Sequence, residues 1–203
     1  MKFLIAFFLI TGYVYAPQTQ SDWTFTKEQD GIKMFSRPSK QSKFNDIKIE
    51  AEFAGTVEQL TSILLNVEKY TDWAYATKSS VLIKKISKTE IIYYSEIDVP
   101  WPANNRDFYA HCKVTFDSST HSAKVVSSSI KDYQPEKKNI VRIPLSNGTW
   151  NISSVGNKKL HVEYTLQLDP GGTVPAWLLN LFSTKGPMET FEKLKQKMAA
   201  LNV

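Results

Sequence analysis

The chain has 203 residues, of which 42% are hydrophobic, 12% aromatic and 22% charged, and its formal net charge is +5. These values are typical of one globular domain with a sizeable core, and they argue against a disordered chain or a strongly basic nucleic-acid-binding protein. A single cysteine, Cys112, excludes an internal disulfide framework and a cysteine-cluster zinc site. Because the three histidines lie far apart in the sequence, we expect no metal site and no cofactor.

The N-terminal segment has the pattern of a secretory signal. Lys2 precedes an apolar stretch that ends at a small residue, Ala16, and the stretch is too short to span a bilayer comfortably. We therefore predict that residues 1–16 direct export to the periplasm or out of the cell. Pro17 is a poor residue after a cleavage site, so a shifted cut and a retained anchor both stay open. A buried first helix is the remaining alternative.

The rest of the chain, residues 21–203, is predicted to form one domain that begins with strands. Apolar and polar residues alternate in three short runs, which lie at residues 23–25, 31–37 and 44–53. Asp30-Gly31 between the first two runs is a strong hairpin signal. The third run has one polar face, so one side of that strand is expected to face water.

A short helical region comes next. Thr56 and Gln59 have the spacing of a capping box, in which each side chain accepts from the other residue's backbone N–H. Apolar residues then recur at helical spacing. They are Val57, Leu60, Ile63, Leu64 and Val67.

Six further strands and a long helix complete the predicted order. The strands are expected at residues 80–86, 90–99, 106–116, 123–129, 148–155 and 159–168. The helix begins near Pro175, and we expect a kink or break at Gly186-Pro187 because proline removes a helix hydrogen bond. Consecutive strands with hairpin connections predict an antiparallel sheet and the α+β class. One long helix on the concave face of a curved sheet can leave a cavity between the two.

Three segments resemble the START domain, the lipid-transfer domain of the helix-grip superfamily. Residues 93–108 (YYSEIDVPWPANNRDF) resemble the family's strand, Pro-aromatic-Pro turn and Asn-Arg-Asp strand start. Residues 148–150 (GTW) with 161–172, and residues 174–180 (VPAWLLN), follow in the family's order and spacing. The closest resemblance is to phosphatidylcholine transfer proteins. It implies a curved sheet around a long C-terminal helix and an apolar tunnel that holds one lipid or sterol.

Polar candidates for the ligand site lie on two neighbouring strands. In relatives the arginine that matches Arg106 often meets the ligand head group, and a guanidinium suits a phosphodiester. The alternative role for Arg106 is a structural salt bridge that closes the turn. Glu96 and Tyr94 share one strand face, which is either interior or simply wet; an interior Glu96 needs a partner such as Arg106 or Arg142.

The remaining candidates are apolar or aromatic, and each is either core or tunnel wall. One group forms a stripe of period two and consists of Phe108, Ala110 and Cys112. The others are Trp73, Trp150, Tyr164 and Leu166, together with Trp177, Leu178, Leu181 and Phe182 on the last helix. The helix residues are expected to face the sheet. Catalysis by Cys112 is disfavoured, because the neighbouring His111 faces the other side of the strand.

These patterns favour a carrier over an enzyme. We expect non-catalytic binding and transfer of a lipid, a sterol or another apolar ligand in an internal tunnel. The C-terminal helix or adjacent loops are expected to gate that tunnel. The protein is expected to be monomeric, to touch membrane surfaces transiently through residues such as Trp101, and to bind no nucleic acid. The alternative is an enzyme of the same fold, a cyclase or hydrolase of apolar substrates.

Overall fold

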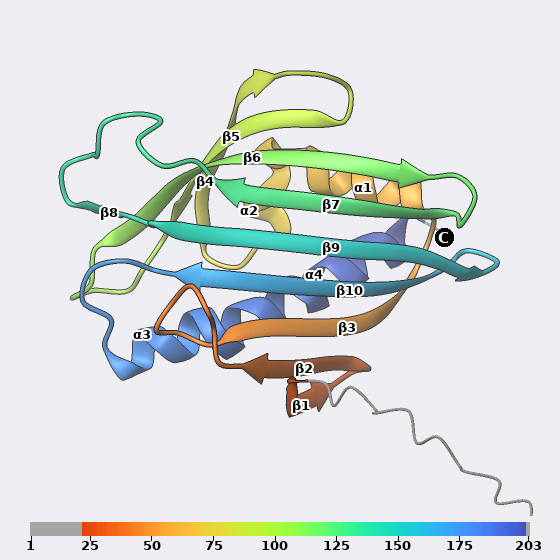
Figure 1. Ribbon diagram of the computed structural model, residues 1–203, viewed down its shortest axis with the longest axis horizontal. Coiled ribbons are helices and arrows are strands. Elements are labelled where there is room, and N and C mark those ends of the chain that lie inside the picture. Colours follow the sequence, from red (N-terminus) through yellow and green to blue (C-terminus); the bar gives the residue numbers. More distant parts are fainter. Residues whose placement is uncertain (1–21, 202–203) are drawn as a thin grey trace, which may run out of the picture.

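One large sheet and a C-terminal helix make up the two main layers of the molecule, which Figure 1 shows as a computed structural model. The structure describes residues 22–201, so the predicted export signal lies outside the described residues. The strands are β1 (Thr24–Gln29), β2 (Ile32–Arg37), β3 (Asp46–Ala54), β4 (Thr77–Lys85), β5 (Glu90–Ile97), β6 (Asn105–Asp117), β7 (Ser122–Ser129), β8 (Ile140–Arg142), β9 (Leu145–Gly156) and β10 (Lys159–Asp169). The helical segments are α1 (Val57–Leu65), η1 (Val67–Lys69), α2 (Tyr70–Trp73), α3 (Ala176–Asn180), η2 (Leu181–Lys185) and α4 (Gly186–Ala200).

The strands form a single sheet in the order β1-β2-β3-β10-β9-β7-β6-β5-β4. Every neighbouring pair along this path is antiparallel, as the hairpin connections predict. The pairing of β3 with β10 brings the start and the end of the domain together. The short strand β8 was not predicted, and it pairs with β6 in parallel.

Local sequence signals explain the turns and the first helix. Asp30 and Gly31 both have positive φ, at 51° and 73°, which is the geometry of the predicted Asp-Gly hairpin. Thr56 Oγ1 accepts the Gln59 N–H at 3.3 Å, and the Gln59 side chain accepts the Thr56 N–H at 2.8 Å. The capping box therefore fixes the start of α1, and both predictions are confirmed.

The core lies between the sheet and the helices α1 and α4. Figure 1 shows α4 running along one face of the sheet, behind β3 and β10 in this view. Four side chains of α4 at helical spacing are almost fully buried, namely Met188, Phe191, Leu194 and Met198. They pack with α1 and with the inward faces of the strands in one continuous cluster.

The interruption of the last helix takes the form of a π turn rather than a break. In η2 the Gly186 N–H bonds to Leu181 O, five residues back, and Gly186 itself is helical at φ −60° and ψ −51°. The wider turn relieves the clash of the Pro187 ring with the preceding turn. Within residues 22–201, no helix is long and apolar enough to cross a bilayer.

Candidate ligand-binding cavity

A cavity of about 210 Å³ lies between the sheet and the C-terminal helix. Its walls come from β5, β6, β7, β9 and β10 on one side and from α1, α2, the start of β4, η2 and α4 on the other. The sheet residues that line it include Tyr93, Ser95, Ile97, Phe108, Cys112, Val125, Ser127, Ser146, Gly148, Trp150, Tyr164, Leu166 and Leu168. The opposite wall includes Leu64, Tyr70, Trp73, Ala74, Tyr75, Thr77, Leu181, Phe182, Gly186, Pro187, Thr190 and Phe191.

Stacked aromatic rings build one wall of the cavity. Trp150 stacks on Phe191 with ring centres 5.2 Å apart, and it packs against Tyr164 at 4.3 Å with the two rings tilted by 34°. Tyr70 packs edge-on against Tyr93 at 5.6 Å. These contacts join β5, β9 and β10 to α2 and α4, so the aromatic residues hold the wall together as well as line it.

Eight of the fifteen predicted ligand-binding residues line this cavity. They are Trp73, Phe108, Cys112, Trp150, Tyr164, Leu166, Leu181 and Phe182. Their contacts with a ligand stay predictions. Ala110 and Leu178 are fully buried but lie outside the lining. The prediction that Trp177 faces the sheet is wrong, because its side chain is 42% exposed while its neighbour Leu178 turns inward.

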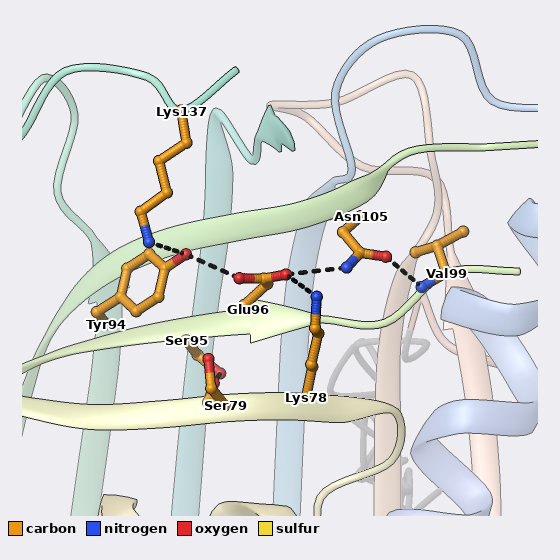
Figure 2. Close-up of polar contacts among 8 residues, drawn as sticks. All are labelled: Lys78, Ser79, Tyr94, Ser95, Glu96, Val99, Asn105 and Lys137. Atoms are coloured by element: carbon orange, nitrogen blue, oxygen red, sulfur yellow. Dashed lines mark hydrogen bonds and ion pairs between the residues drawn. The ribbon is translucent and has the colours of Figure 1, made fainter. Parts of the chain in front are cut away.

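Tyr94 and Glu96 point away from the cavity. Alternate residues of β5 face opposite sides of the sheet, and Tyr93, Ser95 and Ile97 face the lining. Figure 2 shows the Glu96 carboxylate on the other side, between the Tyr94 hydroxyl and the ammonium of Lys78. Glu96 is therefore buried on the face opposite the cavity, and neither it nor Tyr94 belongs to the lining in which they were expected.

A network of neighbouring side chains holds Glu96 in its charged form. Lys78 Nζ and Asn105 Nδ2 each donate to its Oε1 at 2.9 Å. Burial raises the pKa of Glu96, but these hydrogen bonds and the charge of Lys78 lower it by more, so its pKa lies below the usual value. The expected arginine partner is thus replaced by Lys78. Asn105 also accepts the Val99 N–H, which ties the turn after β5 to this network.

Arg106 lies on the cavity face of β6 but outside the lining. It pairs with Ile97, a lining residue, so both side chains stand on the same face of the sheet. Its guanidinium donates to the carbonyl oxygens of Asn104 and Thr173, and its Nε is buried without a partner in the described structure. Burial lowers its pKa. These bonds connect two loops, and a head-group role for Arg106 stays a prediction.

Arg142 and Asp107 form an ion pair on the outer face of the sheet. Arg142 Nε and Nη2 donate to the two carboxylate oxygens of Asp107 at 2.6 and 3.2 Å. Arg142 therefore lies on the face opposite the cavity, and its expected pairing with Glu96 is wrong. Asp107 and Arg106 face apart, as neighbours on a strand must.

Several lining residues were not among the predicted ones, notably Tyr93, Ser95 and Ile97 of β5. The sequence does hold a signal for them. Positions 91, 93, 95 and 97 carry no charge, whereas the alternate face of the same strand carries Glu96 and Asp98. An uncharged alternating face is the one that a strand buries.

The electrostatic character of the cavity is uniformly neutral. In the part of the chain that the structure describes, no lining side chain is an Asp, Glu, Lys, Arg or His. Burial raises the pKa of the phenols of Tyr70, Tyr93 and Tyr164, and it raises the pKa of the Cys112 thiol to about 12. All four groups are therefore protonated at neutral pH.

The sequence that builds this curved antiparallel sheet and C-terminal helix matches a known family. The START domain model matches residues 16–202. The chain belongs to the START domain family. START domains have the helix-grip fold, in which the sheet wraps around the C-terminal helix, and the architecture described above is that fold.

Three relatives are 26–29% identical to this chain over the aligned residues. An uncharacterized protein of Pseudomonas aeruginosa is 29% identical over 176 residues, covering 86% of this chain and 85% of its own length. The phosphatidylcholine transfer protein of Mus musculus is 27% identical, covering 83% and 79%. A crystal structure of a STAR-related lipid transfer protein from Xanthomonas axonopodis superposes with a TM-score of 0.79 at 26% identity, covering 88% of this chain and 99% of that chain.

Proposed function

We propose that this START domain binds one lipid or similar apolar molecule in the cavity and carries it between membranes without altering it. The observation that supports this proposal is the cavity wall, which is made of aromatic, aliphatic and small hydroxyl side chains. Such a wall gains free energy by covering the apolar surface of a ligand. The family match adds support, since START domains are lipid-transfer domains.

The chemistry of the cavity wall favours carriage of a lipid over catalysis, because no described side chain of the wall is ready to act as a nucleophile, an acid or a base. A nucleophilic thiol must be deprotonated to react, and burial raises the pKa of Cys112 to about 12. The Glu96 carboxylate and the Asp107–Arg142 pair, which could serve as acid or base, belong to the outer face. The residues that face a bound molecule are therefore suited to holding it.

A lipid needs a way in, and the C-terminal helix offers one. A volume of about 210 Å³ is below the roughly 300–1,000 Å³ of pockets for drug-sized ligands, so a wall must move to admit a lipid. Leu181 and Phe182 of η2 line the cavity next to the π turn. Lifting this segment breaks side-chain contacts, whereas opening the sheet breaks ladder hydrogen bonds. We propose that η2 and the neighbouring loops are the gate.

Exposed aromatic and aliphatic side chains provide a membrane contact near that gate. Trp101 is 91% exposed in the turn between β5 and β6, and Leu179 of α3 is partly exposed together with Trp177. Tryptophan favours the membrane–water interface. We propose that a monomer touches the bilayer with these residues during exchange, after export directed by residues 1–16.

The direct test is to purify the full chain and record its native mass spectrum before and after incubation with lipid vesicles. One bound lipid for each protein, followed by transfer of labelled lipid from donor to acceptor vesicles, is the expected result. A spectrum that shows only bare protein with every lipid class offered would contradict the proposal. Intact mass of the exported protein, compared with its cytosolic precursor, tests the signal separately.

A further inference from the structure

We propose that the cavity selects an uncharged lipid that carries a hydroxyl group, and that three hydroxyl side chains of the sheet receive this group. The inference rests on the proposed lipid-binding function and narrows it to one chemical class of ligand. Two independent features support it. One is the absence of charge from the lining, and the other is a cluster of hydroxyls around Gly148.

A charged head group inside this cavity would have no counter-charge. The described lining residues offer phenols, phenyl rings, alkyl groups, small hydroxyls, two indoles and one thiol. Burial raises the pKa of Tyr70, Tyr93 and Tyr164. A raised phenol pKa means that the site disfavours a negative charge. Moving a phosphate or sulfate from water into such surroundings is costly unless it is paired.

The hydroxyls of Tyr93, Ser127 and Tyr164 come from three different strands and converge. Tyr93 Oη and Ser127 Oγ lie 3.0 Å apart across the sheet. Ser127 stands directly opposite Gly148 in the pairing of β7 with β9. A side-chain carbon on Gly148 would lie 3.1 Å from the Tyr164 hydroxyl, so that hydroxyl sits over Gly148. Side chains at opposite positions of antiparallel strands are neighbours, which places all three hydroxyls around one point.

Gly148 leaves the space that this hydroxyl cluster (Tyr93, Ser127 and Tyr164) needs. Its missing side chain leaves room for the Tyr164 ring, which packs against Trp150 with an angle of 34° between the two rings. The hydroxyls of Tyr93 and Ser127 bond to each other, whereas the Tyr164 hydroxyl has no hydrogen-bond partner among the described residues. A phenol both donates and accepts, so Tyr164 can bond the hydroxyl of a ligand with Tyr93 and Ser127 close by.

The nearest buried cation, Arg106, does not supply the missing charge. It lies beyond the lining at the end of the cavity marked by Ile97, and its hydrogen bonds go to the backbone carbonyls of Asn104 and Thr173. Within the described structure no carboxylate pairs with it, and its Nε is buried without a partner, but the guanidinium holds two loops together and does not reach the cavity lining. An anionic lipid would have to displace those bonds to reach it.

The test uses pairs of lipids that differ only in charge. The full chain is incubated with vesicles that contain cholesterol or cholesterol sulfate, and with vesicles that contain dioleoylglycerol or dioleoylphosphatidic acid. Native mass spectrometry and a vesicle-competition titration measure binding. We expect the uncharged member of at least one pair to bind about tenfold or more tightly than its charged partner. Equal or tighter binding of the charged members overturns this inference but leaves lipid carriage standing, whereas no binding of any lipid overturns both.

Three variants test the hydroxyl cluster itself. Tyr164→Phe keeps the ring stack and removes one hydroxyl, so it should weaken binding of the hydroxylated lipid by about three- to tenfold. It should leave binding of cholestene, which is cholesterol without its hydroxyl, unchanged. Tyr93→Phe and Ser127→Ala should act in the same direction, and Tyr94→Phe, on the outer face of β5, is the matched control. An unchanged ratio of cholesterol to cholestene binding in all three cluster variants overturns the role of the cluster.

Discussion

Arg142 and Asp107 are joined by two hydrogen bonds, of 2.6 Å from Nε and 3.2 Å from Nη2, in an ion pair that is almost fully buried. The pair ties the short strand β8 to β6, because the two residues are also register partners. Arg142 further donates to the carbonyl oxygens of Gln134 and Pro135. One guanidinium therefore holds the middle of the connection between β7 and β8 against the outer face of the sheet.

We expect Arg142→Met to lower the free energy of unfolding by about 3–5 kcal/mol, because it leaves the buried carboxylate of Asp107 without a partner. Urea unfolding followed by tryptophan fluorescence measures this change. The control is Lys159→Met, which breaks the exposed pair with Glu52 and should change stability much less. Equal effects of the two variants would contradict the prediction, because they would show that the buried pair contributes no more to stability than an exposed one.

The pH dependence of stability should report on Glu96. Its pKa is lower in the folded protein than in the unfolded chain, so its network contributes stability above the ordinary value of 4.5 and loses it as the pH falls through the lower folded pKa. Glu96→Gln should therefore be less stable than the wild type at neutral pH, and the difference should shrink as the pH drops below about 4.5. Unfolding curves over this range test it, with the exposed Glu28→Gln as the control. A difference that stays constant with pH would contradict the prediction.

Arg106→Met separates the two roles considered for this arginine. Because its hydrogen bonds go to the carbonyls of Asn104 and Thr173, we expect a loss of about 1.5–3 kcal/mol in stability. The preference between charged and uncharged lipids should not change. Unfolding curves and the paired-lipid titration measure the two quantities on the same preparation. A selective loss of charged lipids would instead assign Arg106 to the head group.

The sequence predicts most of the fold because two periodicities of apolar residues indicate where its strands and helices lie. Alternation of period two places the strands, and spacing of 3.6 residues places α1 and the inner face of α4. The strand β8 escapes prediction because its three residues are too few to show a period. The π turn also escapes, since Gly186-Pro187 indicates a disturbance of the helix but not the form that it takes.

Much less of the site could be predicted, since alternation defines two faces of a strand without saying which one is inside. In β5 the sequence analysis predicts Tyr94 and Glu96 as ligand-binding residues, whereas Tyr93 and Ser95 line the cavity. The convergence of hydroxyls on Gly148 depends on which strands become neighbours. That order is a property of the whole sheet, so no local pattern contains it.

Trp101 should control membrane contact without affecting the fold. Its side chain is 91% exposed, so Trp101→Ala removes few contacts within the protein. We expect weaker association with vesicles, slower lipid transfer and an unchanged melting temperature, because an interfacial tryptophan is lost. Val155→Ala, half exposed on the hairpin at the other end of the sheet, is the control. Transfer rates that fall equally in the two variants would contradict a specific membrane contact at Trp101.

The gate prediction concerns the contact between η2, α4 and the loop after α2. A side-chain carbon on Gly186 would lie 2.9 Å from the Tyr75 ring, and Tyr75 N–H donates to Thr190 Oγ1 at 3.0 Å. Both Gly186 and Tyr75 line the cavity, so separating them opens it. Gly186 itself leaves no room for a side chain, since a carbon there would also lie 2.7 Å from the carbonyl oxygen of Leu181. Paired cysteines at positions 75 and 190, which both line the cavity, should therefore block lipid exchange when oxidised and restore it when reduced, in a Cys112→Ser background.

The melting temperature should rise or stay level on oxidation, because a cross-link restricts the unfolded chain. The two single-cysteine variants in the same background control for the loss of the Tyr75 ring and for the loss of the Thr190 hydroxyl. Exchange between labelled vesicles is measured before and after reduction. If the oxidised protein exchanges lipid as fast as the reduced one, the C-terminal helix stays closed during exchange. Entry would then take place at the turn that carries Trp101.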